Sequence, residues 1–381
     1  MGKISGKFQL EPDGFSIHTF EVTKKLSGKE YRKLVDETYC RCPPGQIYRD
    51  KTWQGAGERH RCKWFQREGL RISFEQDIHH QVVSCRLRIA VNPRKLIDPN
   101  SSYVGILPPT EESVGAVSKA FFIALKKSGL PCVLDAYQLS RVDLCVNVRC
   151  DSTALFKELL RVTRKLPTPP KYERAIFKSA DRKTASKYNR HHITLKHKSR
   201  ELVIYDKTYQ IIENGLLLDE EKLPKGVLRF EVHELRERIS KVEKKLGTGS
   251  VTSLLCHYIG QSERIITRCF GRAYPDKKFM QPDRLRSLIH AEADTAVGDG
   301  MARLAEVMVR VKTLKKGVKK IGKEGYDAEA VLAQFARLSI SPFRCGKSSV
   351  PGPCRVFSFC WRESLTGTYR FGTSKDIFGE L

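Results

Sequence analysis

Polar and apolar residues alternate in five short segments of the chain between residues 84 and 234. A period of two residues is typical of strands that turn one face to the core and the other to solvent. The alternation predicts strands over residues 84–92, 140–150, 191–197, 200–207 and 226–234. In the fourth segment the apolar run Leu202, Val203 and Ile204 leads directly into Tyr205, so that this tyrosine would be held on a rigid element.

Helical periodicity fills the intervals between these strands. Residues 111–129 and 152–166 have helical patterns, and Gly129 is a candidate C-cap. Together the segments predict an α+β fold, an antiparallel sheet with flanking helices. Beyond residue 236 helical patterns replace the strand signals. We therefore predict an α+β domain at residues 1–240, a mostly helical domain at 241–340 and a basic tail containing Gly, Ser and Pro at 341–381.

The net charge indicates the kind of partner. The 381 residues include 69 Lys and Arg against 43 Asp and Glu, a formal charge of +26 at pH 7. This excess favours a polyanionic partner, above all nucleic acid, because phosphates exchange their counterions for protein cations. No apolar run approaches the roughly 18 residues that span a bilayer, and the N-terminus lacks the apolar core of a signal peptide. We expect a cytoplasmic protein without a membrane partner.

The 12 cysteines follow neither a zinc-binding nor a disulfide pattern. Cys40 and Cys42 are separated by one residue, and no Cys-x-x-Cys pair occurs in the chain. Zinc sites and redox motifs depend on such spacing. In a cytoplasmic protein most cysteines are therefore expected to be small buried apolar residues.

The positive charge is concentrated in residues 161–200, which contain 13 Lys or Arg and only two acidic residues. Three prolines at positions 167–170 favour a basic loop beside the sheet. Because the segment directly precedes the strand that ends in Tyr205, it is a candidate DNA contact. A solvated surface would give the same charge run. The candidate contacts are Lys178, Arg182, Lys183, Lys187 and Arg190.

Three predicted strands place reactive side chains on their polar faces. One carries Asp143, one Tyr205 and Lys207, and one Glu231 with His233. If the strands are neighbours, these groups converge. Two carboxylates suit Mg²⁺ or Mn²⁺, which can bridge to phosphate oxygens. A tyrosine is a weak nucleophile unless a cation stabilises its phenolate, a role that Lys207 could fill. Any solvated sheet face also shows charges at this spacing.

Five blocks of the chain, in this order, form a recognisable set: "SCRLRIAVNPRKL", "QLSRVDLCVNVRC", "RELVIYDKTYQ", "KGVLRFEVHELRERI" and "KEGYDAEAV". Together they resemble the gene II type replication initiators of filamentous phages. The resemblance covers roughly residues 80–340, with more distant similarity to plasmid and conjugative-element initiators of the replication-initiation-factor group. It implies rolling-circle replication in a bacterial host cell: the protein nicks one strand at a double-stranded origin, keeps the 5′ phosphate on a tyrosine, and later rejoins the nicked single strand. A host helicase and polymerase are implied partners.

The resemblance assigns roles to individual residues. Tyr205 matches the nucleophile, and Asp143 and Glu231 match acidic positions that would hold Mg²⁺, with Mn²⁺ as an alternative. The basic neighbours Arg141, Lys207 and Arg229 match as well. The chain lacks the His-apolar-His motif of the larger initiator superfamily, so the metal ligands do not carry over directly. The histidines at 79, 80, 191 and 192 are then expected to contact solvent or phosphate.

Two other functions fit the charge. The first is a non-catalytic, sequence-specific DNA-binding regulator, although the chain has no evident helix-turn-helix signature. A single-strand binder would need aromatic residues among the basic ones, and the basic segment is not rich in them. Tyr209, four residues after Tyr205, would lie near it on either a strand or a helix. We predict a packing or stacking role for Tyr209 and a single nucleophile.

Overall fold

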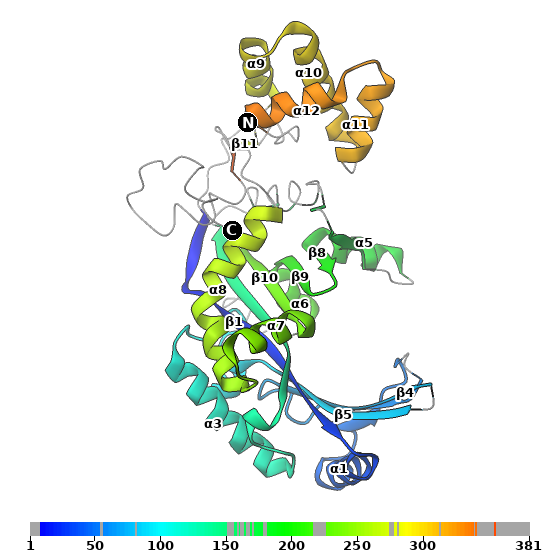
Figure 1. The fold of residues 1–381 in the computed structure, drawn as a ribbon, viewed down its shortest axis with the longest axis vertical. Helices are drawn as coiled ribbons and strands as arrows, with labels where there is room; N and C mark the ends of the chain where they lie inside the picture. The colour runs from blue at the N-terminus through cyan, green and yellow to red at the C-terminus, as the bar shows by residue number, and fades with distance from the viewer. Residues whose placement is uncertain are drawn as a thin grey trace.

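An antiparallel sheet of ten strands forms the body of the protein in the computed structural model (Figure 1). The model describes residues 8–53, 56–80, 82–150, 171–177, 181–215, 226–273, 282–311 and 314–338, and positions 156–157, 160, 164, 168–169, 278–279, 340 and 354–355. The strands of the sheet are β1 (Phe8–Leu26), β2 (Ile47–Arg49), β3 (Glu58–Cys62), β4 (Leu70–His79), β5 (Val82–Val91), β6 (Gln138–Cys150), β7 (Glu173–Ala175), β8 (His192–His197), β9 (Arg200–Asp206) and β10 (Val227–Leu235).

The strands are hydrogen-bonded in the order β2-β3-β4-β5-β1-β6-β10-β9-β8-β7. The long strands β1 and β6 lie at the centre and pair with each other. The helices are α1 (Gly28–Arg41), α2 (Pro93–Ile97), α3 (Glu111–Ser128), α5 (Arg182–His191), α6 (Lys207–Glu213), α7 (Arg236–Leu246), α8 (Val251–Ala273), α9 (Pro282–Glu292), α10 (Thr295–Arg310), α11 (Leu314–Lys323) and α12 (Ala328–Arg337). The predicted α+β class, with its antiparallel sheet and helical C-terminal region, is confirmed.

The five predicted strands correspond to β5, β6, β8, β9 and β10. The fourth is one residue shorter than predicted, because β9 ends at Asp206 and Lys207 begins α6. The Asp206 side chain accepts a hydrogen bond of 2.9 Å from the backbone N–H of Tyr209, the N-cap contact that starts a helix. The strand that presents Tyr205 therefore ends directly after it.

The predicted helix at residues 111–129 is α3. Thr110 caps its first turn, and Gly129 ends it with the left-handed φ of 71° that favours glycine. The predicted helix at 152–166 is described only at 156–157, 160 and 164, which are helical; its remaining positions lie outside the described residues.

Helix α8 lies across one face of the sheet, along β1 and β10 (Figure 1). Phe270 of α8 packs edge-on against Phe230 of β10, with ring centroids 5.4 Å apart. The Ser262 hydroxyl of α8 donates to the backbone carbonyl of Phe15 in β1, at 3.0 Å. Because successive strand residues point to opposite faces, Glu231, next to Phe230, projects from the face away from α8.

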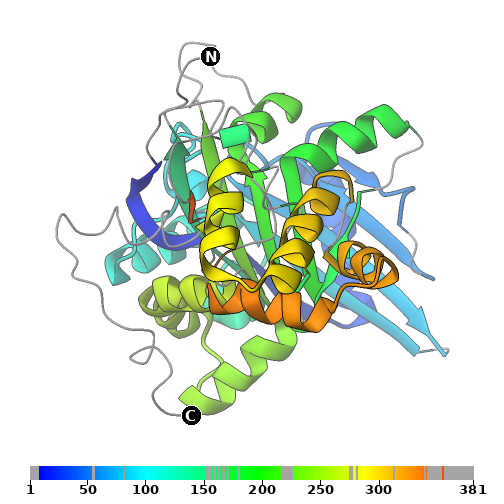
Figure 2. The same ribbon diagram turned by 90° about the horizontal axis from the view of Figure 1, so that it is seen from above.

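The packing of α7 and α8 bears on the predicted domain boundary at residue 240. Arg236 in α7 donates to the carbonyl of Leu139 in β6 at 2.8 Å, and α8 buries its apolar side on the sheet. The predicted boundary therefore falls within α7 and separates α8 from the sheet that it covers. Helices α9 to α12 lie together at one end of the molecule (Figures 1 and 2), and we call them the helical module. Of the predicted tail, Cys354–Arg355 form β12, which pairs with β11 (Lys278–Phe279).

The basic segment contains a helix where a loop was predicted. Asp181 caps α5 by accepting from the backbone N–H groups of Lys183 and Thr184. The three prolines lie upstream of this cap, so they do not interrupt the helix. The prediction of a basic loop beside the sheet is therefore wrong for residues 182–191. Of the helices that the structure describes, none has the length and apolar character to cross a membrane.

Candidate functional site

Tyr205 is the penultimate residue of β9 and faces Arg229 of β10 and His192 of β8 across the sheet. Its hydroxyl donates a hydrogen bond of 2.7 Å to Glu231 Oε1. Burial and the Glu231 charge raise the pKa of the phenol well above its ordinary value. In this structure Tyr205 is therefore a neutral hydroxyl whose proton points at a carboxylate.

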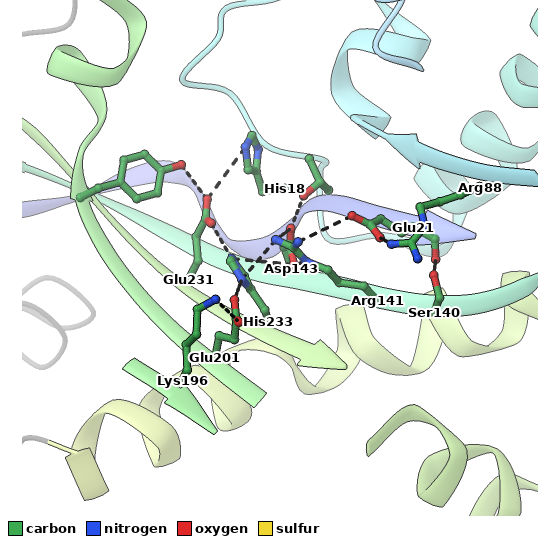
Figure 3. Close-up of polar contacts among 12 residues, drawn as sticks. His18, Glu21, Arg88, Ser140, Arg141, Asp143, Lys196, Glu201, Glu231 and His233 are labelled. Atoms are coloured by element: carbon green, nitrogen blue, oxygen red, sulfur yellow. Dashed lines mark hydrogen bonds and ion pairs between the residues drawn. The ribbon is translucent and has the colours of Figure 1, made fainter. Parts of the chain in front are cut away.

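Glu231 is the centre of a line of polar contacts (Figure 3). His233 Nε2 lies 2.9 Å from Glu231 Oε2 and 3.8 Å from Asp143 Oδ1, and its Nδ1 is 3.3 Å from Glu201 Oε2. Burial acts to lower the pKa of His233, but the three carboxylates outweigh it and raise the pKa to about 9. His233 is therefore an imidazolium at neutral pH that links Glu231 to Asp143.

Asp143 and Glu231, the two predicted metal ligands, are bridged by His233. Both oxygens of Asp143 accept from Arg141, at 2.6 and 2.9 Å, and Oδ2 also accepts from the Thr19 hydroxyl. For Glu231, burial acts to raise the pKa, but the hydrogen bond from His233 and nearby positive charge hold it well below its ordinary value. Both side chains therefore already have hydrogen-bonding partners. Arg141, a predicted DNA contact, is half-buried, and part of its guanidinium is engaged in the ion pair with Asp143.

His18 on β1 completes the cluster, and no pattern in the sequence indicated it. Its Nε2 lies 3.9 Å from Glu231 Oε1, and its Nδ1 is buried without a hydrogen bond to any described residue. Burial, with the charge of Arg229, lowers the pKa of His18 well below its ordinary value, so it is neutral. The β1–β6 register shifts between Ile17 and Thr19, and this bulge lets His18 and Thr19 line the same pocket. A bulge breaks the alternation from which a strand is predicted.

Arg229, predicted to contact DNA, is wholly buried in this structure, and its contact with DNA stays a prediction. Its Nε donates to Asn147 Oδ1 at 2.7 Å, and Nη2 donates to the carbonyl of Val104. The remaining nitrogen, Nη1, has no hydrogen bond of good geometry to a described residue and lies 4.0 Å from Glu231 Oε1. Because that oxygen also accepts from Tyr205, a fixed positive charge is held beside the tyrosine hydroxyl.

Lys207, predicted to be the cation beside Tyr205, lies at the start of α6 and not on the strand. Its Nζ donates to Gln210 Oε1 at 2.7 Å and lies 5.8 Å from the centre of the Tyr205 ring. Burial, with the nearby charge of Arg229, lowers the pKa of Lys207 well below its ordinary value. The predicted cationic role therefore does not fit this structure, and Arg229 holds the charge instead.

Two of the histidines pack against tyrosines. His192 is nearly parallel to Tyr205, with ring centroids 5.7 Å apart, and burial lowers its pKa to about 4. His191 stacks on Tyr209 at 3.9 Å and contacts Asp206. A strand-to-helix junction separates the two tyrosines, so neither of the geometries considered for the pair applies. His80 is exposed, and the side chain of His79 lies outside the described residues.

The predicted basic contacts lie on or near α5. Lys183 and Arg190 are exposed, whereas Lys187 pairs with Glu213 at 2.5 Å and lies over the Tyr209 ring. The side chain of Arg182 and the whole of Lys178 fall outside the part of the chain that the structure describes.

A pocket of about 350 Å³ opens over this cluster on the face of the sheet away from α8. Side chains from seven adjacent strands, β4 to β8 in the order of the sheet, line it together with Gln210 of α6, and most of them are polar or charged. Tyr205, Glu231, His233, His18 and Asp143 all contribute. The cluster is thus buried but reaches solvent through a polar opening, which suits a charged substrate better than an apolar one.

The donors around Glu231 suit a divalent cation in their chemistry. Glu231 offers a carboxylate and His18 a neutral imidazole, whereas the protonated His233 is not a metal donor. Carboxylates bind Mg²⁺ and Mn²⁺, and an imidazole shifts the preference toward Mn²⁺. Within the described ranges, no three or more His, Cys, Asp or Glu side chains are spaced as a ready-made ligand set. Binding would therefore require the hydrogen bonds around Glu231 to rearrange.

Comparison of the chain with protein-family models and with curated proteins finds no match. The function is therefore argued from the site.

Proposed function

We propose that this chain is a site-specific DNA strand-nicking and closing enzyme that uses Tyr205 as its nucleophile. The hydrogen bond of 2.7 Å between Tyr205 and Glu231 carries the proposal, because it joins a nucleophile to a proton acceptor. Both groups line a polar pocket, and the +26 charge of the chain suits a nucleic-acid substrate. The resemblance to gene II type initiators supports the same residue and the same reaction.

In the proposed reaction Tyr205 Oη attacks a backbone phosphorus and its proton passes to Glu231. The P–Oη bond forms as the bond from phosphorus to the 3′ oxygen breaks, and that oxygen leaves as a hydroxyl after taking up a proton. The 5′ phosphate stays on Tyr205 as a phosphodiester, so the strand can be rejoined by the reverse steps. One phosphodiester replaces another, and no nucleotide hydrolysis is needed.

Charge develops on the tyrosine oxygen and on the phosphate during this transfer. Arg229 Nη1, 4.0 Å from Glu231 Oε1, is a buried donor that needs no reorganisation to stabilise it. His233, between Glu231 and Asp143, keeps Glu231 ionised and ready to accept a proton. A bound divalent cation, held by Glu231 and His18, would neutralise charge on the phosphate oxygens.

The proposed substrate is one strand of a double-stranded replication origin, with Mg²⁺ or Mn²⁺ as the cofactor. The freed 3′ hydroxyl would then prime a host polymerase, and a host helicase would open the duplex. These partners follow from the resemblance.

The test incubates the protein with supercoiled origin DNA and Mn²⁺ or Mg²⁺ and measures nicked circles that carry covalent protein. Tyr205→Phe removes only the hydroxyl, so we expect the fold and DNA binding to persist and the adduct to be lost. Tyr209→Phe is the matched control and should nick and rejoin at close to the wild-type rate, because Tyr209 stacks on His191.

Two results would contradict the proposal. An adduct formed by Tyr205→Phe would exclude this nucleophile. Wild-type protein that binds the origin tightly but never forms an adduct would favour the non-catalytic regulator. If Tyr209→Phe nicks normally but accumulates unclosed concatemers, two tyrosines share the reaction.

A further inference from the structure

Helix α11 of the helical module carries a row of lysines. It has five lysines among its ten residues and no acidic residue. At 100° per residue these lysines fall within one arc of the helix surface. All five are exposed, and we call them the lysine row: Lys315, Lys316, Lys319, Lys320 and Lys323.

The opposite side of α11 is fixed against α10. Gly317 and Ile321 are buried there. A Cβ atom at Gly317 would lie 2.4 Å from the sulfur of Met308, so a larger residue there would require the Met308 side chain to shift. Gly317 and Ile321 therefore turn the apolar side of α11 toward α10, and the lysine row points outward.

The carboxylates on either side of α11 pair with arginines. Arg303 binds Glu324 at 2.7 Å and Glu306 at 3.4 Å, and Arg286 lies 3.8 Å from Glu306. Glu306 and Glu324 are thus paired with arginines, and α11 itself carries five lysines and no acidic residue. The row therefore concentrates positive charge on one side of the helix.

We propose that the lysine row of α11 binds the phosphate backbone of double-stranded DNA. From Lys315 to Lys323 the row is about 12 Å long, close to the width of about 12 Å of the major groove. Long lysine side chains on one helix face can therefore reach phosphates at both edges of the groove. Charge complementarity and length together favour a duplex.

The surroundings of α11 agree with this partner. Only residues 311–313 separate α10 from α11, and α12 packs on α10 where a Cβ at Gly300 would meet Val331 at 2.6 Å. Many DNA-binding proteins place a helix against a duplex with this arrangement, in which a short connection joins two helices and a third helix packs against them. A membrane-surface helix would instead expose an apolar face, whereas the apolar face of α11 is buried.

This contact is separate from the pocket around Tyr205 and does not require nicking. If the proposed function is also correct, the helical module would hold the duplex while the sheet domain acts on one strand. Failure of either proposal leaves the other testable.

The experiment measures the affinity of the full chain for a fluorescently labelled duplex of arbitrary sequence over a range of salt concentrations. The test variant combines Lys315→Gln, Lys319→Gln and Lys323→Gln. The control combines Lys241→Gln, Lys244→Gln and Lys245→Gln on α7, and so removes the same charge from another exposed helix. A third variant, with arginine at 315, 319 and 323, keeps the charge of the row.

We expect the α11 glutamine variant to raise the Kd about tenfold or more and to lower the slope of log Kd against log salt by about 2.7, or 0.9 for each lost phosphate contact. The α7 control and the arginine variant should keep the wild-type slope. Glutamine favours helices, and thermal unfolding would confirm that each variant folds.

Three outcomes would overturn the proposal. An equal loss of duplex affinity in the α7 and α11 variants would mean that the net charge of the protein, and not a contact through α11, determines binding. An unchanged slope in the α11 variant would return the row to ordinary solvated surface. Loss of binding to phosphatidylglycerol vesicles, with duplex binding intact, would identify a lipid partner. Adduct formation on a single-stranded oligonucleotide, followed in parallel, reports on the nicking proposal alone.

Discussion

Arg229 combines full burial, a fixed charge and a donor nitrogen beside the Tyr205–Glu231 pair. It is also anchored to Asn147 and to the carbonyl of Val104, so substitution affects both the fold and the site. A guanidinium cannot be deprotonated in a protein, whereas an amine in the same position can. Substitution of Arg229 by lysine therefore distinguishes a structural role of this side chain from a role in stabilising charge.

We predict that Arg229→Lys keeps more of the wild-type thermal stability than of the wild-type nicking rate. Burial would lower the pKa of a lysine at this position and so favour its uncharged form. Arg229→Gln should fold less stably and nick at least about 100-fold more slowly, the usual cost of losing a preorganised donor. Asn147→Ala, which removes an anchor of Arg229 but leaves its charge, is the control. The proposal of a charge role fails if Arg229→Gln nicks as fast as the Asn147→Ala protein.

His233 offers a test by pH. Its pKa rises from an ordinary 6.5 to about 9 in the folded protein. A raised pKa stabilises the fold fully below about pH 6.5, and this contribution disappears as the pH rises through 9. Lys207, with its lowered pKa, acts in the opposite direction. Because Lys207 is present in both wild type and His233→Gln, its contribution cancels when the unfolding free energies of the two proteins are subtracted.

The difference in unfolding free energy between wild type and His233→Gln should therefore be largest below pH 6.5. It should shrink by up to about 3 kcal/mol between pH 6.5 and pH 9.5. Urea unfolding at several pH values would measure it. A difference that does not change with pH would mean that His233 is not an imidazolium in the folded protein.

Among the elements, α5 tests whether the basic segment contacts DNA. Lys183 and Arg190 are exposed, whereas Lys187 already pairs with Glu213. Replacing Lys183 and Arg190 by glutamine should lower the slope of log Kd against log salt by about 1.8. Lys187→Gln should lower it by less, because Glu213 already serves as its counterion. Equal effects of the two variants, or no effect, would count against a contact through α5.

At the scale of the whole molecule, the sheet and α8 form one folding unit. Val251, Leu254, Leu255 and Tyr258 of α8 are almost fully buried, as are Ile266 and Phe270. Each such side chain contributes roughly 1.5–3 kcal/mol, so together they contribute as much as the roughly 5–15 kcal/mol net stability of a typical domain. A chain that ends at residue 240 would lose this layer and expose the apolar face of the sheet.

We predict that protein truncated after Ser240 does not unfold cooperatively, whereas protein truncated after Ala273 does. The second retains α8 and loses only the helical module and the tail. Circular dichroism during heating would measure both. A cooperative transition in the shorter protein would show that the sheet does not need α8, and the predicted boundary at residue 240 would stand.

The sequence by itself determined which residues share a face. Alternation placed Asp143 on one strand, Glu231 and His233 on another and Tyr205 on a third, and the register brings all four to one side of the sheet. Period-two patterns carry this information because successive side chains must point to opposite faces. The antiparallel α+β class followed from the same patterns.

Only the tertiary structure decided the order of the strands, the burial of the polar face and the charge of its residues. Alternation gives the face of a side chain but not its neighbours across the sheet. Burial by distant parts of the chain lowers the pKa of Lys207 and encloses the fixed charge of Arg229. The bulge that directs His18 into the pocket depends on pairing between β1 and β6, residues more than a hundred positions apart. Such contacts leave no local pattern in the chain, and so no reading of residue spacing could have predicted them.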